Sequence, residues 1–149
     1  MTEELLTCHD WFKTFAALAD GLDKVPADRP LDGMDASGFL LAESPATDRH
    51  TVLFFGPDSG LMSVKWRNIK AVLRYSDGVD KPILKQQFPM FFDLGSDPQE
   101  LHNLFGRKLD MGWMLLPVFK AIAEFEQSAA KYPHIKPGEE FEGYASQGE

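Results

Sequence analysis

Three short runs rich in β-branched and aromatic residues lie close together in the middle of the chain, and they constrain its fold more than any other feature. The runs cover residues 51–55, 61–67 and 70–75. Turn-forming residues separate them, because Gly56, Pro57 and Gly60 lie in the first link and Asn68 lies in the second. Links of this length join antiparallel neighbours in a sheet. With a fourth run at 90–94, we predict a four-stranded antiparallel meander.

The apolar periodicity of residues 109–130 predicts a long helix that covers one face of this sheet. Pro117 lacks an amide hydrogen and its ring clashes with the preceding turn, so we expect the regular helix to begin at this residue. A small antiparallel sheet with a long C-terminal helix packed on it is an α+β fold. The apolar side chains expected to lie along the sheet-facing side are Trp113, Leu116, Phe119, Ile122, Ala123, Phe125 and Ala129.

The N-terminal segment has the pattern of a short amphipathic helix at 11–19. Asp10 is placed to cap its first amides, and Gly21 is placed to end it in the left-handed conformation. Because adjacent helical residues project about 100° apart, we expect Cys8 to be a buried, inert thiol that does not face His9. The apolar stripe that contains Cys8 comprises Leu5, Cys8, Trp11, Phe12, Phe15, Leu18, Ala19 and Leu22.

Between this helix and the strands, Pro and Gly residues favour turns, and one helical turn is expected at 36–41. The sequence therefore predicts four regions: an N-terminal helix at 1–22, a connector at 23–50, an α+β subdomain at 51–138 and a flexible tail at 139–149. The apolar side chains expected to hold the connector in place are Leu31, Met34, Phe39, Leu40 and Leu41.

The acidic balance of the chain limits its partners. Fifteen Lys and Arg against 23 Asp and Glu give a net charge of −8, and such a field repels phosphate backbones and anionic lipid heads. We expect no nucleic-acid partner and no membrane partner. No apolar run reaches the roughly 18 residues of a membrane span, and the acidic start lacks the basic region of a secretory signal. As written, the sequence predicts a soluble cytoplasmic protein, with a periplasmic or secreted location open for a longer parent chain.

The sequence contains no recognisable catalytic or metal-binding motif. No G-x-S-x-G nucleophile signature occurs. The histidines lack the i, i+4 spacing of a helical zinc site; they are His9, His50, His102 and His134. We therefore assign no catalytic residue and no metal ligand to this chain.

Basic and aromatic side chains interleave in the run KWRNIK at 65–70. One interpretation is structural, with the basic side chains solvated and Trp66 in the core. The other is recognition of an anion or a sugar at the sheet, with Lys65 and Arg67 as candidates. His102, from the run GSDPQELHN at 95–103, is a third candidate. In that run Asp97 and Glu100 have the spacing of a capping box before a short helical segment.

Five blocks of sequence, taken in order, resemble the C-terminal part of arylsulfatase-type sulfatases, and the last looks like the end of the bacterial members. They are DWFKTFAALAD, PLDGMDASGFLL, VKWRNIKAVLRY, FFDLGSDPQELHNLF and AIAEFEQSAAKYPHIKPG. One departure is Lys13, which stands where the family often has proline before a threonine. The resemblance implies a four-stranded C-terminal subdomain docked beside a catalytic domain, where it supports packing and forms part of the substrate-cleft rim. Lys65, Arg67 and His102 are the rim candidates.

The resemblance also implies a cofactor set for the full-length family. Its members use a cysteine or serine matured to formylglycine in a C-x-P-S-R type motif, and a divalent cation, usually calcium, polarises the sulfate. In this chain Cys8 is followed by His-Asp-Trp-Phe, and Ser44-Pro45 is followed by Ala-Thr, so neither form of the motif occurs. We expect a segment of a sulfuric ester hydrolase that is inactive alone, as a truncated product or as one piece of a split enzyme.

Partners follow from the N-terminal helix. In a sulfatase this helix would lie on the large sheet of the catalytic domain, so without that sheet its apolar stripe is expected to favour docking or self-association. The side chains involved are Trp11, Phe12, Phe15 and Leu18. The alternative function is a non-catalytic module that binds a protein or a glycan.

Overall fold

The computed structural model describes residues 4–27, 30–78, 80–105, 112–133, 138 and 140. The chain divides into two compact units, one formed by Met1–Arg49 with Glu124–Glu149 and the other by His50–Ala123. We name them the helical unit and the sheet unit, and each is described by itself. The four region boundaries expected from the sequence stay a prediction.

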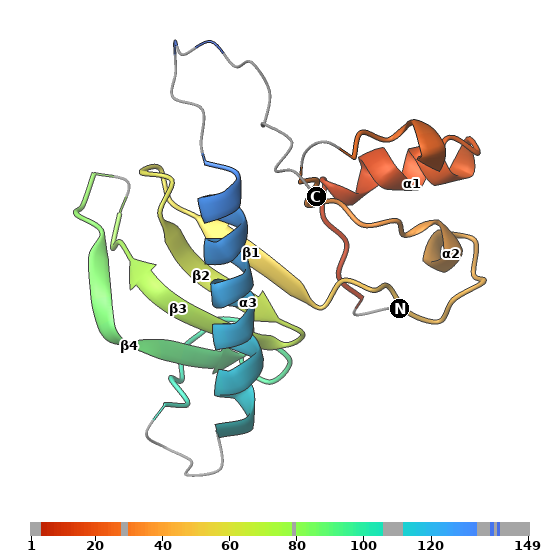
Figure 1. Ribbon diagram of the computed structural model, residues 1–149. Coiled ribbons are helices and arrows are strands. Elements are labelled where there is room, and N and C mark those ends of the chain that lie inside the picture. The colour runs from red at the N-terminus through yellow and green to blue at the C-terminus, as the bar shows by residue number, and fades with distance from the viewer. Residues whose placement is uncertain are drawn as a thin grey trace. The chain divides into compact units, whose positions relative to one another are not determined.

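The sheet unit contains the expected meander. Strands β1 (Thr51–Phe55), β2 (Leu61–Trp66), β3 (Ile69–Tyr75) and β4 (Leu84–Asp93) pair antiparallel in the order β1-β2-β3-β4 (Figure 1). Three of the four strands lie within a residue of their predicted bounds. Strand β4 begins earlier than the predicted residue 90, because its first part pairs with the end of β3 beyond a register shift.

Helix α3 (Gly112–Lys131) lies across one face of the sheet (Figure 1). The expected α+β fold, a four-stranded antiparallel sheet with a long helix, is therefore confirmed. The core between helix and sheet consists of Val64, Ile69, Ala71, Phe91, Met114 and Val118. Pro117 lies inside α3, so the expectation that the helix begins there is wrong. One proline near the start of a long helix removes a single internal hydrogen bond. The predicted first residues of this helix, 109–111, lie outside the described residues.

The side of α3 that faces the sheet is not the one we predicted. Met114 and Val118 are almost fully buried, whereas three members of the predicted stripe are exposed: Trp113 by 60%, Leu116 by 75% and Phe119 by 49%. Ile122, also in that stripe, does pack against the core. The hydrophobic pattern alone could not show which side of α3 meets the sheet. The helix carries apolar residues on two sides, and the pattern gives both sides the same weight.

The helical unit contains α1 (Asp10–Leu18), the 3₁₀ turn η1 (Leu22–Lys24) and α2 (Ser37–Leu40), which is the helical turn expected at 36–41. Asp10 is not the N-cap of α1, because the helix begins at Asp10 itself and His9 precedes it. Asp20, and not Gly21, has the positive φ of 52° at the helix end. Gly21 instead donates its amide to the carbonyl of Ala16 at 2.8 Å, which closes the last turn.

The buried carboxylate of Asp10 holds the helical unit together. It accepts hydrogen bonds from the Thr7 amide at 2.7 Å, the Met34 amide at 2.8 Å and Arg49 Nε at 2.8 Å. Thr14, also buried, accepts from the Ala36 amide at 3.0 Å. These bonds fix the connector to α1.

The apolar side chains expected to hold the connector do so less than predicted, since Met34, Leu40 and Leu41 are exposed. Polar side chains of α1 replace them as anchors, because each satisfies a connector amide that would otherwise lack a partner.

Helix α1 therefore turns its polar side chains inward and its apolar side chains outward. Asp10 and Thr14 are its buried residues, at 1% and 0% exposure. Trp11 and Phe15 stack with their ring centres 5.3 Å apart. The exposed apolar residues form what we name the α1 face: Trp11 (38%), Phe12 (57%), Phe15 (59%) and Leu18 (48%).

Candidate functional site

Two lysines lie directly opposite each other on adjacent strands of the sheet. The register places Lys65 of β2 against Lys70 of β3, next to the core pair Val64 and Ala71. Because side chains alternate along a strand, the two lysines project from the face that α3 does not cover. We name Lys65 and Lys70 the lysine pair, and this side of the sheet, on which Ser63, Val72 and Phe92 are buried, the lysine face.

The two members of the lysine pair have different surroundings. The Nζ atom of Lys70 lies 2.6 Å from a carboxylate oxygen of Glu100 and 5.9 Å from the ring centre of Phe54. The side chain of Lys65 is half-buried, and within the described part of the chain it has no hydrogen bond, ion pair or ring contact. The lysine pair therefore places two cations beside one carboxylate.

The loop after β4 brings Glu100 to this place. The Leu94 amide donates to the carbonyl of Asn68 at 2.8 Å, so the loop begins beside the β2–β3 turn. Glu100 has a positive φ of 56°. No helix forms at 98–105, so the predicted capping box and helical segment are wrong. A residue with positive φ cannot continue a right-handed helix.

Asp97 organises the loop in place of a helix cap. Its carboxylate accepts the amides of Leu101 at 3.1 Å and His102 at 2.7 Å. Burial raises the pKa of Asp97, but these two amides and the charge of His102 lower it more, so the pKa lies below its ordinary value. The Asp97 carboxylate thus links the start of the loop to residues 101 and 102.

The three predicted rim residues do not form one cluster. Lys65 lies in the lysine pair. Arg67 lies in the β2–β3 turn with its guanidinium 5.3 Å from the Trp66 ring centre. That ring is on the α3 side of the sheet, since it meets Trp113 at 6.1 Å. His102 is exposed on the loop that carries Glu100.

Sequence reasoning missed Lys70 and Glu100 as members of the site. Lys70 was visible in principle, because a two-residue turn at 67–68 pairs residue 65 with residue 70. Glu100 could not be identified from the sequence, because its contact with Lys70 spans 30 positions and depends on the conformation of the loop. The interpretation that all three basic side chains are solvated is therefore wrong for Lys70.

A second ion pair lies at the far end of the sheet. Arg74 of β3 contacts Asp58 in the β1–β2 turn, and the Gly60 amide donates to Asp58 at 3.1 Å. Arg74 holds the pKa of Asp58 below its ordinary value. A Cβ atom at Gly60 would lie 1.7 Å from the Arg74 guanidinium, so a larger residue there would displace the Arg74 side chain. This pair shapes the hairpin.

Cys8 differs from its prediction. Its thiol is exposed, and Sγ lies 3.8 Å from Nδ1 of His9. The prediction of a buried thiol facing away from His9 is wrong because α1 starts at Asp10, so the angular spacing of helical residues does not apply to either residue. Within the described residues no hydrogen bond orients the other ring nitrogen of His9, as a catalytic base requires. We assign no reaction to this pair.

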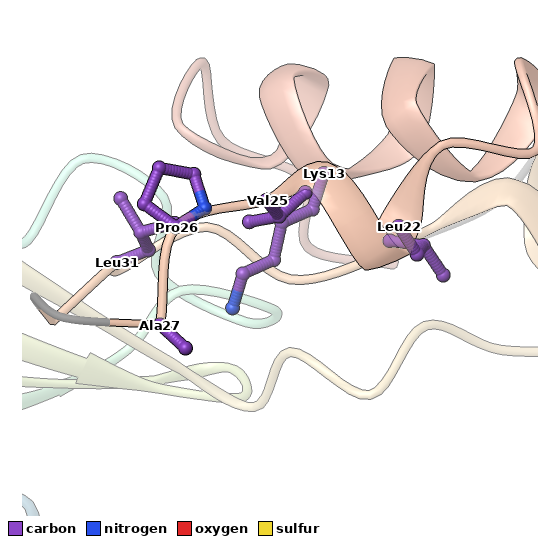
Figure 2. Close-up of a pocket in the computed structure, with 6 residues that line it drawn as sticks. All are labelled: Lys13, Leu22, Val25, Pro26, Ala27 and Leu31. Carbon is purple, nitrogen blue, oxygen red and sulfur yellow. The ribbon is translucent and has the colours of Figure 1, made fainter.

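The helical unit has a pocket of about 430 Å³ between α1 and the following turn (Figure 2). Figure 2 shows the Lys13 side chain extending among apolar neighbours. Its lining consists of Lys13, Leu22, Val25, Pro26, Ala27 and Leu31. These residues supply one cation and no acid or nucleophile, so the pocket lacks the groups needed for catalysis.

Metal ligands do not gather in the described ranges, where no three His, Cys, Asp or Glu side chains come together. No helix in these ranges combines the length and apolarity needed to cross a membrane.

Comparisons with known proteins give a match only at the level of structure. No protein-family profile and no curated protein matches the sequence. The PsFucS1 sulfatase from Pseudoalteromonas sp. superposes with a TM-score of 0.74 at 22% identity, covering 85% of this chain and 26% of that chain.

Two other sulfatases match over a similar share. One, from Bacteroides thetaiotaomicron and described with the metabolism of multiple glycosaminoglycans, has a TM-score of 0.59 at 18% identity, covering 79% of this chain and 24% of its own. The other, in complex with its substrate D-glucosamine-2-N,6-O-disulfate, has a TM-score of 0.55 at 17% identity, covering 83% and 24%.

The chain thus spans about a quarter of the length of the solved structures that it matches. Its fold is that of one segment of a sulfatase. The resemblance stated from the sequence is confirmed at the level of the fold, since the PsFucS1 sulfatase shares that fold over most of this chain.

Proposed function

We propose that this chain is the C-terminal segment of a sulfatase, which packs against a catalytic domain and supports the rim of its substrate cleft. The shared fold and the partial coverage of each sulfatase support this proposal. The substrates would be sulfate esters of saccharides, because the matched structures include one bound to a disulfated glucosamine and one described with glycosaminoglycans.

The α1 face is the single observation that carries the docking role. An amphipathic helix normally buries its apolar side, yet α1 buries Asp10 and Thr14 and exposes its aromatic side. Exposed apolar surface of this kind is typical of a protein interface. We infer that the catalytic domain covers Trp11, Phe12, Phe15 and Leu18.

The catalytic chemistry would belong to that partner domain. The sequence has no C-x-P-S-R type motif for formylglycine. A metal ion in such a site would polarise the sulfate group as a Lewis acid. In this division of labour Lys65, Arg67 and His102 are rim candidates and no residue of the chain takes part in bond breaking.

The first experiment is hydrolysis of an aryl sulfate by the purified 149-residue chain with added calcium. We expect no turnover above the protein-free rate. Turnover by the pure chain that a chelator abolishes would show a complete active site and overturn the proposal.

The second experiment tests docking. The DNA around the codon for Met1 is searched for a C-x-P-S-R type catalytic segment, either in frame or in a neighbouring gene. The segment found there is coexpressed with the chain. We expect the two to copurify. The double variant Phe12→Gln with Phe15→Gln should lose copurification, whereas Leu101→Gln, also strongly exposed but outside the α1 face, should keep it. If both variants copurify equally, the α1 face is not the docking surface.

A further inference from the structure

The lysine pair carries positive charge that the described part of the chain only partly neutralises. Lys65 and Lys70 are direct cross-strand neighbours, and Glu100 contacts Lys70. Like charges directly opposite each other destabilise a sheet. Solvent does not remove this repulsion fully, since the Lys70 side chain is 24% exposed and Lys65 is half-buried. An anion bound between the two ammonium groups would relieve it.

This positive site contrasts with the chain as a whole, whose net charge is −8. By register Arg74 of β3 and Lys85 of β4 lie on the same side of the sheet as the lysine pair, and Asp58 pairs with Arg74. This side is therefore locally cationic, and two adjacent lysines suit a small anionic group.

Apolar side chains of β1 lie beside the lysine pair. Val52 is the cross-strand neighbour of Lys65, and Phe54 lies on the same face two residues further along β1. Phe54 as a residue is 43% exposed, and its ring lies within cation–π range of Lys70. An exposed ring is a platform for the apolar face of a sugar, which inorganic sulfate does not have.

Glu100 completes the arrangement with a hydrogen-bond acceptor. Its carboxylate, 2.6 Å from Lys70 Nζ, retains lone pairs that can accept sugar hydroxyl groups. Cations, an aromatic ring and a carboxylate together match the groups of a sulfated sugar: sulfate, ring carbons and hydroxyls.

We propose that the lysine pair, Phe54 and Glu100 form a non-catalytic subsite for a sulfate-bearing saccharide. The sulfate lies between Lys65 and Lys70, the sugar ring packs on Phe54, and a hydroxyl donates to Glu100. Arg67 takes no part, because its guanidinium lies over Trp66 toward the other side of the sheet. The inference rests on the proposed function, in which sulfated saccharides are the substrates of the adjoining domain.

The test is a calorimetric titration of the full chain with three probes: a sulfated disaccharide prepared from heparin, the same disaccharide after desulfation, and sodium sulfate. We expect saturable binding of the sulfated disaccharide that weakens as salt is raised. The desulfated disaccharide and sodium sulfate should each bind at least about tenfold more weakly, since each lacks one set of contacts.

Variants assign the contacts. Lys65→Gln and Lys70→Gln should each weaken the sulfated disaccharide about tenfold, as expected for loss of one charged hydrogen bond. Phe54→Ala should weaken the disaccharide and leave sodium sulfate unaffected. Lys81→Gln, the same charge change at an exposed lysine between β3 and β4, is the matched control and should have no effect. Lys65→Gln should also raise the melting temperature, which checks folding and the repulsion within the pair.

Three results would overturn the subsite: no saturable binding, equal binding of the desulfated sugar, or equal losses for Lys65→Gln and Lys81→Gln. A different outcome is that the sugar does not bind and Lys65→Gln prevents copurification with the catalytic segment. The anion that pairs with the two lysines is then a carboxylate of that partner. The subsite would then be wrong while the proposed function stands, because docking and hydrolysis are measured independently of sugar binding.

Discussion

Asp10 joins three parts of the helical unit, since its carboxylate contacts Thr7, the Met34 amide and the Arg49 guanidinium. The pair with Arg49 is buried, with side-chain exposures of 1% and 12%. Removing one partner of a buried ion pair leaves an uncompensated charge and costs about 3 to 5 kcal/mol. We expect Asp10→Asn to lower the free energy of unfolding by this amount in urea titrations. Asp23→Asn removes an exposed ion pair with Lys24 and should leave the midpoint unchanged.

The same carboxylate makes this stability depend on pH. Burial raises the pKa of Asp10, but hydrogen bonds from Arg49, Met34 and Thr7 lower it more, so it lies well below its ordinary value. A carboxyl with a lowered folded-state pKa stabilises fully above its unfolded pKa of about 3.9 and loses this contribution as pH falls. The difference between wild type and Asp10→Asn should therefore shrink below about pH 4. A difference that stays constant from neutral pH down to about pH 3 would contradict this account.

Gly33 is the position where the connector passes closest to the start of α1. A Cβ atom there would lie 2.1 Å from the carbonyl oxygen of His9, a backbone atom that cannot move without moving α1. We expect Gly33→Ala to speed hydrogen exchange of the α1 amides at least about tenfold, since overpacking costs roughly 1 to 3 kcal/mol. Gly38→Ala is the matched control, because its Cβ would meet only Ser44 Cβ at 3.8 Å. Equal exchange rates in the two variants would show that the connector adapts.

Among the secondary-structure elements, α3 offers the sharpest test of the observed packing. Met114 is 1% exposed and belongs to the core, while Leu116, two residues later, is 75% exposed. Met114→Ala should lower the free energy of unfolding by about 2 to 5 kcal/mol, because it leaves a cavity. Leu116→Ala should change it by less than about 0.5 kcal/mol. Denaturant titrations measure the free energy of unfolding of the two variants. A larger loss for Leu116→Ala than for Met114→Ala would support the helix face predicted from the sequence.

The strands were predictable because their signals are local. Turn residues bound the run 51–55 on one side and the run 61–67 on both, so strand bounds and antiparallel order followed from neighbouring residues. The buried face of α3 was not predictable, since only the sheet chooses between two apolar sides of the helix. The polar anchoring of the connector was also hidden, because the partners of Asp10 lie up to 39 positions away.

The candidate site also combines a residue that the local sequence identifies with residues that it does not. Lys65 was identified from the KWRNIK run and lies in the lysine pair, yet the run gave no reason to separate Arg67 from it. The positive φ of Arg67 places its side chain outside the alternation of the strand, over Trp66. Glu100 entered the site through a loop that Asp97 links internally by hydrogen bonds, and no spacing rule describes such a loop.

Considered as a whole, the chain exposes apolar surface on both of its units. The helical unit presents the α1 face, and the sheet unit presents an outer side of α3 formed by Trp113, Leu116 and Phe119. A chain that occupies about a quarter of a larger enzyme's length would bury such surfaces against the rest of that enzyme. In the isolated chain, these surfaces can be covered by the same surfaces of other copies.

We therefore expect the isolated chain to self-associate and to bind a hydrophobic dye. Sedimentation velocity over a series of protein concentrations should show mass rising with concentration. The double variant Phe12→Gln with Phe15→Gln should shift the chain toward monomer and lower dye fluorescence. It removes the two most exposed aromatic residues of the α1 face. Leu101→Gln removes an exposed side chain outside both surfaces and should change neither measurement. A wild-type chain that stays monomeric with little dye binding would show that these surfaces need no cover, and the docking role proposed for α1 would lose its physical basis.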